Sequence, residues 1–426
     1  MNKSSLKWCL SVSIAITFLA LLPQLHLWYA RGSEWHGAYA AVDGDEFLYS
    51  AYINALIDGR PRRNDPFSGR DDNPKAPLPE STFSIQFIPS YVIACLARVG
   101  GASASTAFII LIGVAGLLAS IAVFWLLFCV TRDHRISAAG TIFVLCLGGV
   151  AAGEGLMGAF LKGDVTSLGL IFLRRYQPAA SFYLFFVFCT LVWLSLARPN
   201  KRIARLYAAF AGATFGILVF SYLFLWTAAA AWLVCTALLW LYFRSQDRRH
   251  MFEVLAIIGG IALLALPPYL YLVSNRAHTL DETQTLIATH RPDLFRLPEI
   301  IGVVVVAILL IGLRRKRFEI QNEAAIFATA FALLPLVLFN QQVLTGRSMQ
   351  PFHFQSFIAN YTVLVASVIV IGLLLRTVSS RVLLLVGVLS LSWGVLEVEL
   401  ASRARAKSDN VNDQMVPVLQ RLNALS

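Results

Sequence analysis

The chain has little charge: only 14% of its 426 residues are Asp, Glu, Lys or Arg, whereas an ordinary soluble domain has about 25%. Hydrophobic residues make up 58% of the chain, against roughly 45–50% in such a domain. So large an apolar excess cannot be buried in a water-soluble core, and it has to face lipid. The composition therefore excludes a soluble enzyme, a secreted disulfide scaffold and a disordered chain, and it predicts an integral membrane protein.

The sequence also lacks the short motifs of several function classes. It has no phosphate-binding loop of the Walker type, no dinucleotide-binding glycine pattern, no HExxH motif and no paired cysteine spacing. The six cysteines lie singly in apolar stretches, and we interpret them as small buried hydrophobic residues. The apolar runs are almost free of ionisable residues at their middles and show no repeat of fixed period, which argues against an ion-coupled transporter.

What the sequence does have is a series of apolar runs, each near the roughly 20 residues that a membrane-spanning helix needs. We predict an all-α integral membrane protein with about eleven transmembrane helices, in one polytopic domain over residues 1–426. The predicted spans are 8–29, 106–130, 136–157, 181–197, 206–222, 223–243, 252–273, 298–313, 322–339, 358–375 and 382–398. Residues 84–99 are apolar but short and contain Pro89, so we interpret them as an interfacial helix. A short C-terminal tail, 399–426, follows the last span.

The distribution of basic residues predicts the orientation, because short cytoplasmic loops are enriched in Lys and Arg. With the N-terminus in the cytoplasm, 17 of the 35 basic residues but only five of the 24 acidic ones fall in cytoplasmic segments. Membrane topology then explains the formal net charge of +11, and no nucleic-acid partner is indicated. If 84–99 were counted as a span, every later loop would change sides and the run from Arg314 to Arg317 would lie outside. This is the main reason to interpret 84–99 as interfacial. The first apolar run is longer than the core of a signal peptide, which favours an uncleaved helix.

Polar residues collect in the outer loops, above all in the first, residues 30–105. Within it, Asp43, Asp45 and Glu46 place three carboxyl groups at the start of an amphipathic helix over 47–59, whose apolar stripe should rest on the membrane surface or on the helix bundle. In a purely structural interpretation, Asp45 caps this helix and the helix dipole favours Glu46. That interpretation leaves Asp43 unexplained, and we identify the three acids as candidate catalytic residues.

Later outer segments supply candidate binding residues. Arg174, Arg175 and Tyr176 are consecutive, and such an arginine pair can grip phosphate oxygens bidentately or extend to lipid headgroups. The loop over 340–353 is rich in hydrogen-bonding side chains, which favours a cavity filled by water or ligand. Its candidate binding residues are Gln342, Arg347 and His353. Asp164 is a further candidate, for binding a divalent cation together with the acids of the first loop.

Taken in order, these features resemble the GT-C superfamily of integral-membrane glycosyltransferases, which use lipid-linked sugars. The resemblance covers residues 1–135: one span, a long outer loop that begins with the acidic motif DGDEFLY at 43–49, and a second span. Protein O-mannosyltransferases and lipid A aminoarabinose transferases are similar in placing an Asp-Glu pair in this loop, which implies that Asp45 is the catalytic acid-base residue and Glu46 its neighbour. The chain departs from both families in lacking a large soluble domain after the last span, and it has no WWDYG-type motif of oligosaccharyltransferases.

Three functions remain open from the sequence: the two described next, and a structural or assembly partner without chemistry. The first is a glycosyltransferase that moves a sugar from a polyprenyl-phosphate-linked donor to a lipid, glycan or protein hydroxyl acceptor on the outer face of the membrane. A carboxylate of Asp45 or Asp43 would take the acceptor proton, and arginines would stabilise the leaving phosphate, which leaves a requirement for a divalent cation open. The second is a carrier or flippase for a lipid-linked or other amphiphilic substrate. We expect a protein of the bacterial inner membrane, and no residue pattern specifies its sugar, acceptor or oligomeric state.

Overall fold

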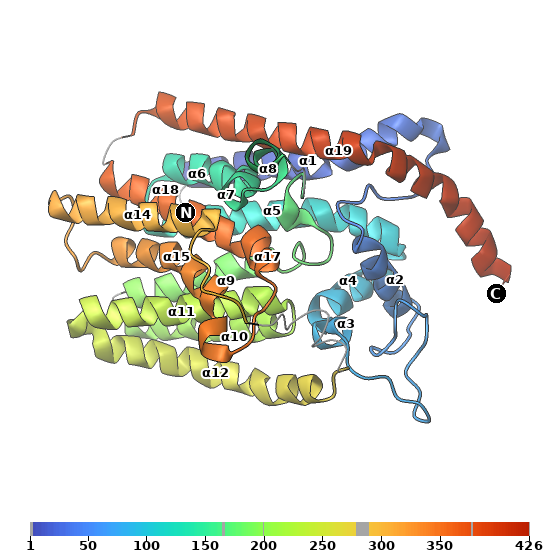
Figure 1. Cartoon of the computed structure of the whole chain (residues 1–426), viewed down its shortest axis with the longest axis horizontal. Helices are drawn as coiled ribbons and strands as arrows, with labels where there is room; N and C mark the ends of the chain where they lie inside the picture. The colour runs from blue at the N-terminus through green and yellow to red at the C-terminus, as the bar shows by residue number, and fades with distance from the viewer. Residues whose placement is uncertain (1–2, 164–166, 199, 278–288, 376–377, 426) are drawn as a thin grey trace.

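The computed structural model describes residues 3–163, 167–198, 200–277, 289–375 and 378–425. These parts of the chain are helical, with no strand beyond three isolated bridges. The long helices lie side by side along one axis, and the first outer loop sits at one end of the bundle (Figure 1). This arrangement confirms the predicted all-α fold class.

The helices have the following bounds. In chain order they are α1 (Lys3–Arg31), α2 (Glu46–Ile57), α3 (Thr82–Ile85), α4 (Phe87–Gly100), α5 (Ala104–Thr131), α6 (His134–Cys146), α7 (Gly148–Ala152), α8 (Gly155–Lys162), α9 (Phe182–Ala197), α10 (Lys201–Val219), α11 (Leu223–Phe243), α12 (Arg248–Ser274), α14 (Leu297–Arg314), α15 (Glu323–Asn340), α16 (Gln342–Thr345), α17 (Pro351–Phe354), α18 (Asn360–Leu374) and α19 (Ser380–Leu425). Single turns between them are η1 (Gly32–Glu34), η2 (Ile171–Leu173), η3 (Ser245–Asp247) and the π-helical turn η5 (Gln355–Ala359).

Each of the eleven predicted spans corresponds to helix in the structure. Nine helices are long and apolar enough to cross a membrane, counted over the described residues. The predicted span 136–157 is not one straight helix: α6 and the pair α7–α8 meet at a bend of 57°, as in a broken span or a re-entrant loop, and counting the pair as one span brings the number to ten. The eleventh, α9, has only 16 residues and packs between α5 and α10. The chain is therefore an integral membrane protein.

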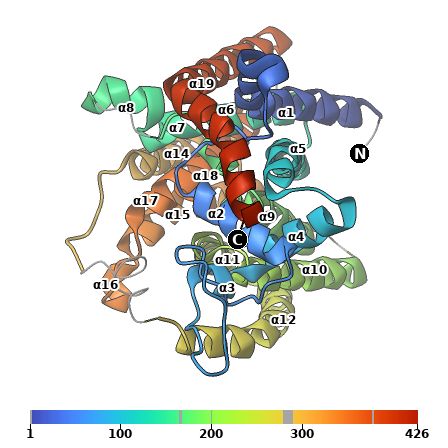
Figure 2. The same ribbon diagram turned by 90° about the vertical axis from the view of Figure 1, so that its right-hand side faces the viewer.

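The apolar stretch at 84–99 lies outside the set of spans. It forms the single turn of α3 and the 14-residue helix α4, which is too short to cross a membrane. Helix α4 packs against α2 and α5 at the outer-loop end of the bundle (Figures 1 and 2). Because α4 does not cross, α5 returns through the bundle antiparallel to α1.

Helix α2 buries one face, as predicted for 47–59, although Phe47 and Ala51 of the predicted apolar stripe are exposed. Its buried face carries Tyr52 and Leu56, which belong to a small apolar core together with Phe83 of α3. The apolar face of α2 therefore packs against the rest of the protein, which is one of the two placements expected, the other being the membrane surface. The helix ends just before Gly59, whose φ of +84° is a conformation that glycine adopts without strain.

The last helix continues well beyond the bundle. Helix α19 has 46 residues, so that 399–425, expected as a short C-terminal tail, are helical and reach the first outer loop (Figure 1). The buried Asp413 accepts a hydrogen bond of 3.1 Å from the backbone N–H of Ala38. One turn earlier, Asp409 accepts a 3.3 Å bond from the backbone N–H of Ala41. The end of α19 thus holds the segment that leads into the acidic motif.

Candidate active site

A cavity of about 420 Å³ opens between the first outer loop and the helix bundle. Its walls come from α2 and α3, from the loop that precedes α9, from the start of α11 and from α17. Three residues predicted from the sequence, Asp45, Arg174 and His353, line it together. The volume falls within the range of pockets that bind small molecules.

Asp45 and Arg174 face each other in this cavity. The Nη1 atom of Arg174 lies 3.2 Å from Oδ2 of Asp45, and their side chains are 7% and 56% exposed. The guanidinium is therefore part of the wall, whereas the carboxylate faces open space. Asp45 occupies the residue position before α2, but its side chain caps no backbone N–H. Its own N–H donates to Oδ1 of Asp43 at 2.9 Å, so that Asp43 shapes the turn on which Asp45 sits.

Arg174 is held in place without using all of its donors. Its Nε donates to the carbonyl oxygen of Gln177 at 2.8 Å, and the guanidinium carbon lies 4.7 Å from the ring centre of Phe357. Burial alone would lower the pKa of Arg174, but Tyr222, Tyr49 and the two aspartates outweigh it and raise the pKa above its ordinary value. The side chain keeps its charge, and its five N–H donors leave some for a ligand.

A second ion pair lies behind the cavity wall, between the residues that follow Asp45 and Arg174 in the sequence. Glu46 and Arg175 are completely buried, with Nη1 of Arg175 at 3.0 Å from Oε2 of Glu46. The Glu46 carboxylate also accepts the backbone N–H groups of Arg175 and Val42, at 2.7 and 3.1 Å. Burial raises the pKa of Glu46, and Arg175 opposes this shift. Neither side chain lines the cavity, but their contact holds Asp45 opposite Arg174.

The other candidates lie outside the cavity. The Tyr176 hydroxyl is buried and donates to the carbonyl oxygen of Gln86 at 2.9 Å. Gln342 is buried and Arg347 is exposed, and neither lines the cavity. Asp164 falls outside the described residues, and among those that are described no three His, Cys, Asp or Glu side chains lie close enough to hold a metal ion.

The cavity contains polar residues that sequence reasoning missed. Nε2 of Gln177 donates to Oε1 of Gln86 at 3.1 Å, and the same oxygen accepts the backbone N–H of Leu223 at 3.1 Å. Tyr222, at the start of α11, stands beside Arg174, and burial raises its pKa so that it keeps its proton. A glutamine inside the apolar stretch at 84–99 was the available signal for Gln86, whereas nothing in the sequence marked Tyr222.

His353 closes one side of the cavity. Its ring stacks on Phe224 of α11, with the ring centres 4.5 Å apart and the planes at 8°. Its Nδ1 atom is buried and has no hydrogen-bond partner among the residues that the structure describes. Buried polar atoms are normally hydrogen-bonded, so this nitrogen is an exception among the described residues.

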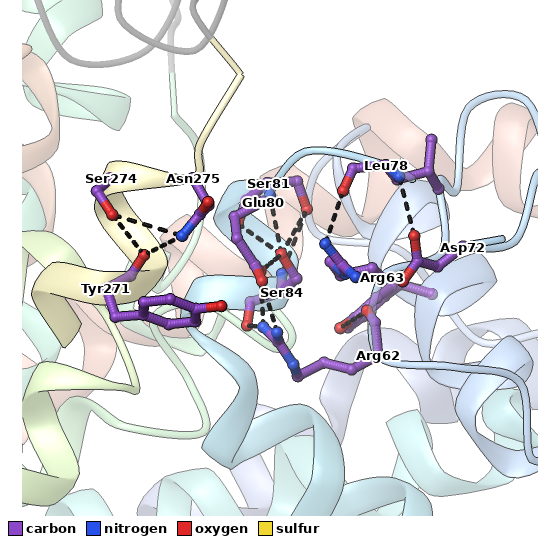
Figure 3. Close-up of polar contacts among 11 residues, drawn as sticks. Arg62, Arg63, Asp72, Leu78, Glu80, Ser81, Ser84, Tyr271, Ser274 and Asn275 are labelled. Carbon is purple, nitrogen blue, oxygen red and sulfur yellow. Dashed lines mark hydrogen bonds and ion pairs between the residues drawn. The ribbon is translucent and has the colours of Figure 1, made fainter. Parts of the chain in front are cut away.

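The loop between α2 and α3 contributes Phe67 to the cavity lining, and a further ion pair joins two parts of this loop (Figure 3). Arg62 donates to both carboxylate oxygens of Glu80, at 2.6 and 2.7 Å, and the Ser84 hydroxyl donates to the same carboxylate at 2.5 Å. The backbone of Glu80 pairs with the chain just after α12, through Asn275 and Ala277. This backbone pairing ties the first outer loop to the end of α12, which is far away in the sequence.

Replacing Arg62 with Met tests this contact. The change leaves the nearly buried Glu80 carboxylate without its cation, so we expect the free energy of unfolding to fall by about 1–3 kcal/mol. Arg60→Met is the matched control, because Arg60 pairs with Asp71 at the surface and such pairs contribute about 0–1 kcal/mol. Denaturant unfolding in detergent measures both values, and equal losses would contradict the role of Glu80.

The helical bundle, with the acidic loop over a cavity at one end, has the fold of a solved membrane protein. Among solved structures, the chain is similar to ArnT from Cupriavidus metallidurans, crystallised bound to undecaprenyl phosphate, with a TM-score of 0.53 and 15% sequence identity. The match covers 89% of this chain and 62% of that one, so the chain spans about three fifths of the length of ArnT. No family model and no curated protein matches the sequence. The similarity shows that the two chains share an all-α membrane fold, the fold class expected from the sequence.

Proposed function

We propose that this protein is a glycosyltransferase that moves a sugar from a polyprenyl-phosphate-linked donor to a hydroxyl group of a lipid, glycan or protein. The pairing of Asp45 with Arg174 in a polar cavity supports this function. A carboxylate beside a guanidinium offers a base for the acceptor and a cation for the phosphate. The ArnT structure holds undecaprenyl phosphate, which belongs to the class of lipid proposed here as the sugar carrier.

The transfer exchanges one bond for another. The acceptor oxygen attacks the anomeric carbon of the sugar, and the bond from that carbon to the phosphate oxygen breaks. Asp45 takes the proton of the attacking hydroxyl, and the polyprenyl phosphate leaves with the bonding electron pair. Arg174 stabilises the phosphate charge; because phosphate competes for this guanidinium, donor binding also frees the Asp45 carboxylate to act as a base. Asp43 supports the turn, or is itself the base if it reaches the acceptor.

The remaining cavity residues suit a sugar. Gln86 and Gln177 bring amide groups to the wall, and the imidazole ring of His353 lines the cavity as well. Burial raises the pKa of Tyr49 to about 12, so its hydroxyl stays neutral and can donate a hydrogen bond. A few polar groups among aromatic rings are typical of pockets that orient a small polar ligand.

We further propose that the cavity faces the outside of a bacterial inner membrane and that the N-terminus is cytoplasmic. The loops rich in Lys and Arg join the helices at the end of the bundle away from the cavity (Figure 1), as the positive-inside rule requires. Labelling a cysteine placed at the exposed Ser68 with a membrane-impermeant maleimide, in a variant whose exposed Cys95 is replaced by Ser, tests the orientation. Labelling in intact cells supports it, and labelling only after lysis contradicts it.

Arg174→Gln tests the proposed function at the phosphate. Loss of one charge-stabilising donor typically costs about 10²–10³ in kcat, and we expect a loss of that size in the release of undecaprenyl phosphate from sugar-linked donors in proteoliposomes. Native mass spectrometry should show weaker binding of undecaprenyl phosphate, whereas binding of undecaprenol, which lacks the phosphate, should not change. The same assay with EDTA decides whether a divalent cation takes part.

Arg347→Gln is the comparison variant, since the sequence nominated this arginine too but its side chain is exposed and outside the cavity. We expect it to keep wild-type activity and lipid binding. Full activity of Arg174→Gln would remove Arg174 from the reaction, and a loss confined to Arg347→Gln would relocate the phosphate site.

A further inference from the structure

A second cavity lies at the opposite end of the bundle from the candidate active site. It has a volume of about 370 Å³ and runs between the first turns of α1, α6 and α19, which pack against one another. Its walls are almost entirely apolar, with Val12 from α1, Ile142 from α6 and Leu391 from α19. The polar lining comes from Arg135 and Ser380, which stand at the beginnings of α6 and α19 and therefore at the mouth.

The mouth of this groove is basic. Nη1 of Arg135 donates to Oγ of Ser380 at 2.8 Å, and no ion pair joins Arg135 to a carboxylate within the part of the chain that the structure describes. Asp133, the acid nearest in sequence, uses its carboxylate to accept backbone N–H groups as the N-cap of α6. Lys3 and Arg381, on the first turns of α1 and α19, are exposed at the same end. The groove thus joins an apolar channel to a cluster of cations.

Trp8 indicates where the mouth of the groove lies relative to the membrane. It lines the groove, is 43% exposed and lies with its ring centre 6.2 Å from that of His134, the first residue of α6. Tryptophan is enriched where a membrane meets water, so the mouth lies at the level of lipid headgroups. The positive ends of three helix dipoles also meet there and add to the attraction for an anion.

From this combination we infer that the groove binds an anionic phospholipid, with an acyl chain between α1, α6 and α19 and its phosphate group at Arg135. A soluble anion would bind the basic residues at the mouth but leave the apolar walls uncovered. A zwitterionic lipid would be attracted less strongly by the surrounding cations. The inference does not depend on glycosyl transfer. In the proposed orientation the lipid belongs to the cytoplasmic leaflet, which is rich in anionic lipids.

Native mass spectrometry of the full-length protein, titrated with phosphatidylglycerol and with phosphatidylcholine of equal chain length, tests this site. We expect wild-type protein to prefer phosphatidylglycerol. Arg135→Ala should weaken binding of that lipid roughly fivefold and leave phosphatidylcholine unchanged. Arg315→Ala removes an exposed arginine beyond α14 at the same end of the bundle, and it should keep the wild-type preference.

Filling the groove tests the place of the acyl chain. A Cβ at Gly387 would meet only Ile142, at 3.9 Å, so Gly387→Leu can direct its side chain into the groove and should reduce binding of both lipids. Ala139→Leu, at another lining position, replaces it if that variant does not fold. Equal losses in Arg135→Ala and Arg315→Ala, no preference in the wild type, or binding of inorganic phosphate as tight as that of phosphatidylglycerol would overturn the inference.

Discussion

Replacing Asp45 with Asn should abolish sugar transfer and leave the protein folded. The substitution keeps the shape of the side chain but removes its ability to take a proton, and loss of a general base typically lowers kcat by about 10²–10⁴-fold. The carboxylate is more than half exposed and makes one ion pair, so its loss should change the free energy of unfolding by no more than about 1 kcal/mol. Turnover in proteoliposomes and unfolding in detergent measure the two effects separately.

The controls for this result are two other aspartates that flank α2. Asp58, exposed at the far end of α2, supplies a matched Asp→Asn change that should leave turnover unchanged. Asp43→Asn decides which aspartate is the base, since a positioning role for Asp43 predicts a smaller loss than that of Asp45→Asn. Full transfer by Asp45→Asn would remove the proposed base, and substrate translocation that survives the change without any transfer would favour the carrier hypothesis.

The adjacent carboxylate should behave in the opposite way. Glu46→Gln leaves the buried Arg175 guanidinium without its counter-ion, and removing one partner of a buried pair typically costs about 3–5 kcal/mol. We expect a large fall in thermal stability of the purified protein, with loss of activity following from loss of structure. Asp45→Asn and Glu46→Gln would thus separate chemistry from folding at neighbouring positions.

A double-mutant cycle gives this result its control. Arg175→Met alone should also destabilise the protein, because it strands the Glu46 carboxylate. Combining Glu46→Gln with Arg175→Met removes both charges, and the double variant should be more stable than the sum of the single losses predicts. Strict additivity would contradict the buried ion pair. The double variant is expected to recover stability only in part. Glutamine has one acceptor oxygen where the Glu46 carboxylate has two, and the backbone N–H of Val42 donates to one of those two.

Much of the fold could be predicted because lipid imposes a simple rule on apolar run length, and each predicted span is helical. The bend within 136–157 was missed, although a glycine pair marks it. Gly148 lies so close to Tyr361 of α18 that a Cβ would be 2.5 Å from the ring. A glycine pair is a known site of helix kinks, but only the neighbouring helix shows that the close approach occurs here.

The candidate site could be predicted in composition but not in detail. The acidic motif and the arginine pair were each visible, yet sequence order cannot tell which acid meets which arginine. Consecutive residues point in different directions, so Asp45 with Arg174 forms the cavity wall while Glu46 with Arg175 is buried behind it. Arg347 was nominated on its loop composition alone, and its place outside the cavity depends on packing over long sequence separations.

The hold of α19 on the acidic segment has a consequence for biosynthesis. Residues 38–45 leave the ribosome early, but Asp409 and Asp413, which bind that segment, are added more than 360 residues later. At 5–20 residues per second, the wait lasts roughly 20–70 s. During this time the backbone N–H groups of Ala38 and Ala41 lack their α19 acceptors, whereas Gln24 of α1 is already available to the N–H of Ala40. The contacts with α19 can form only after residue 413 has been made, so a chain that ends before it would hold the acidic segment through its earlier partners alone.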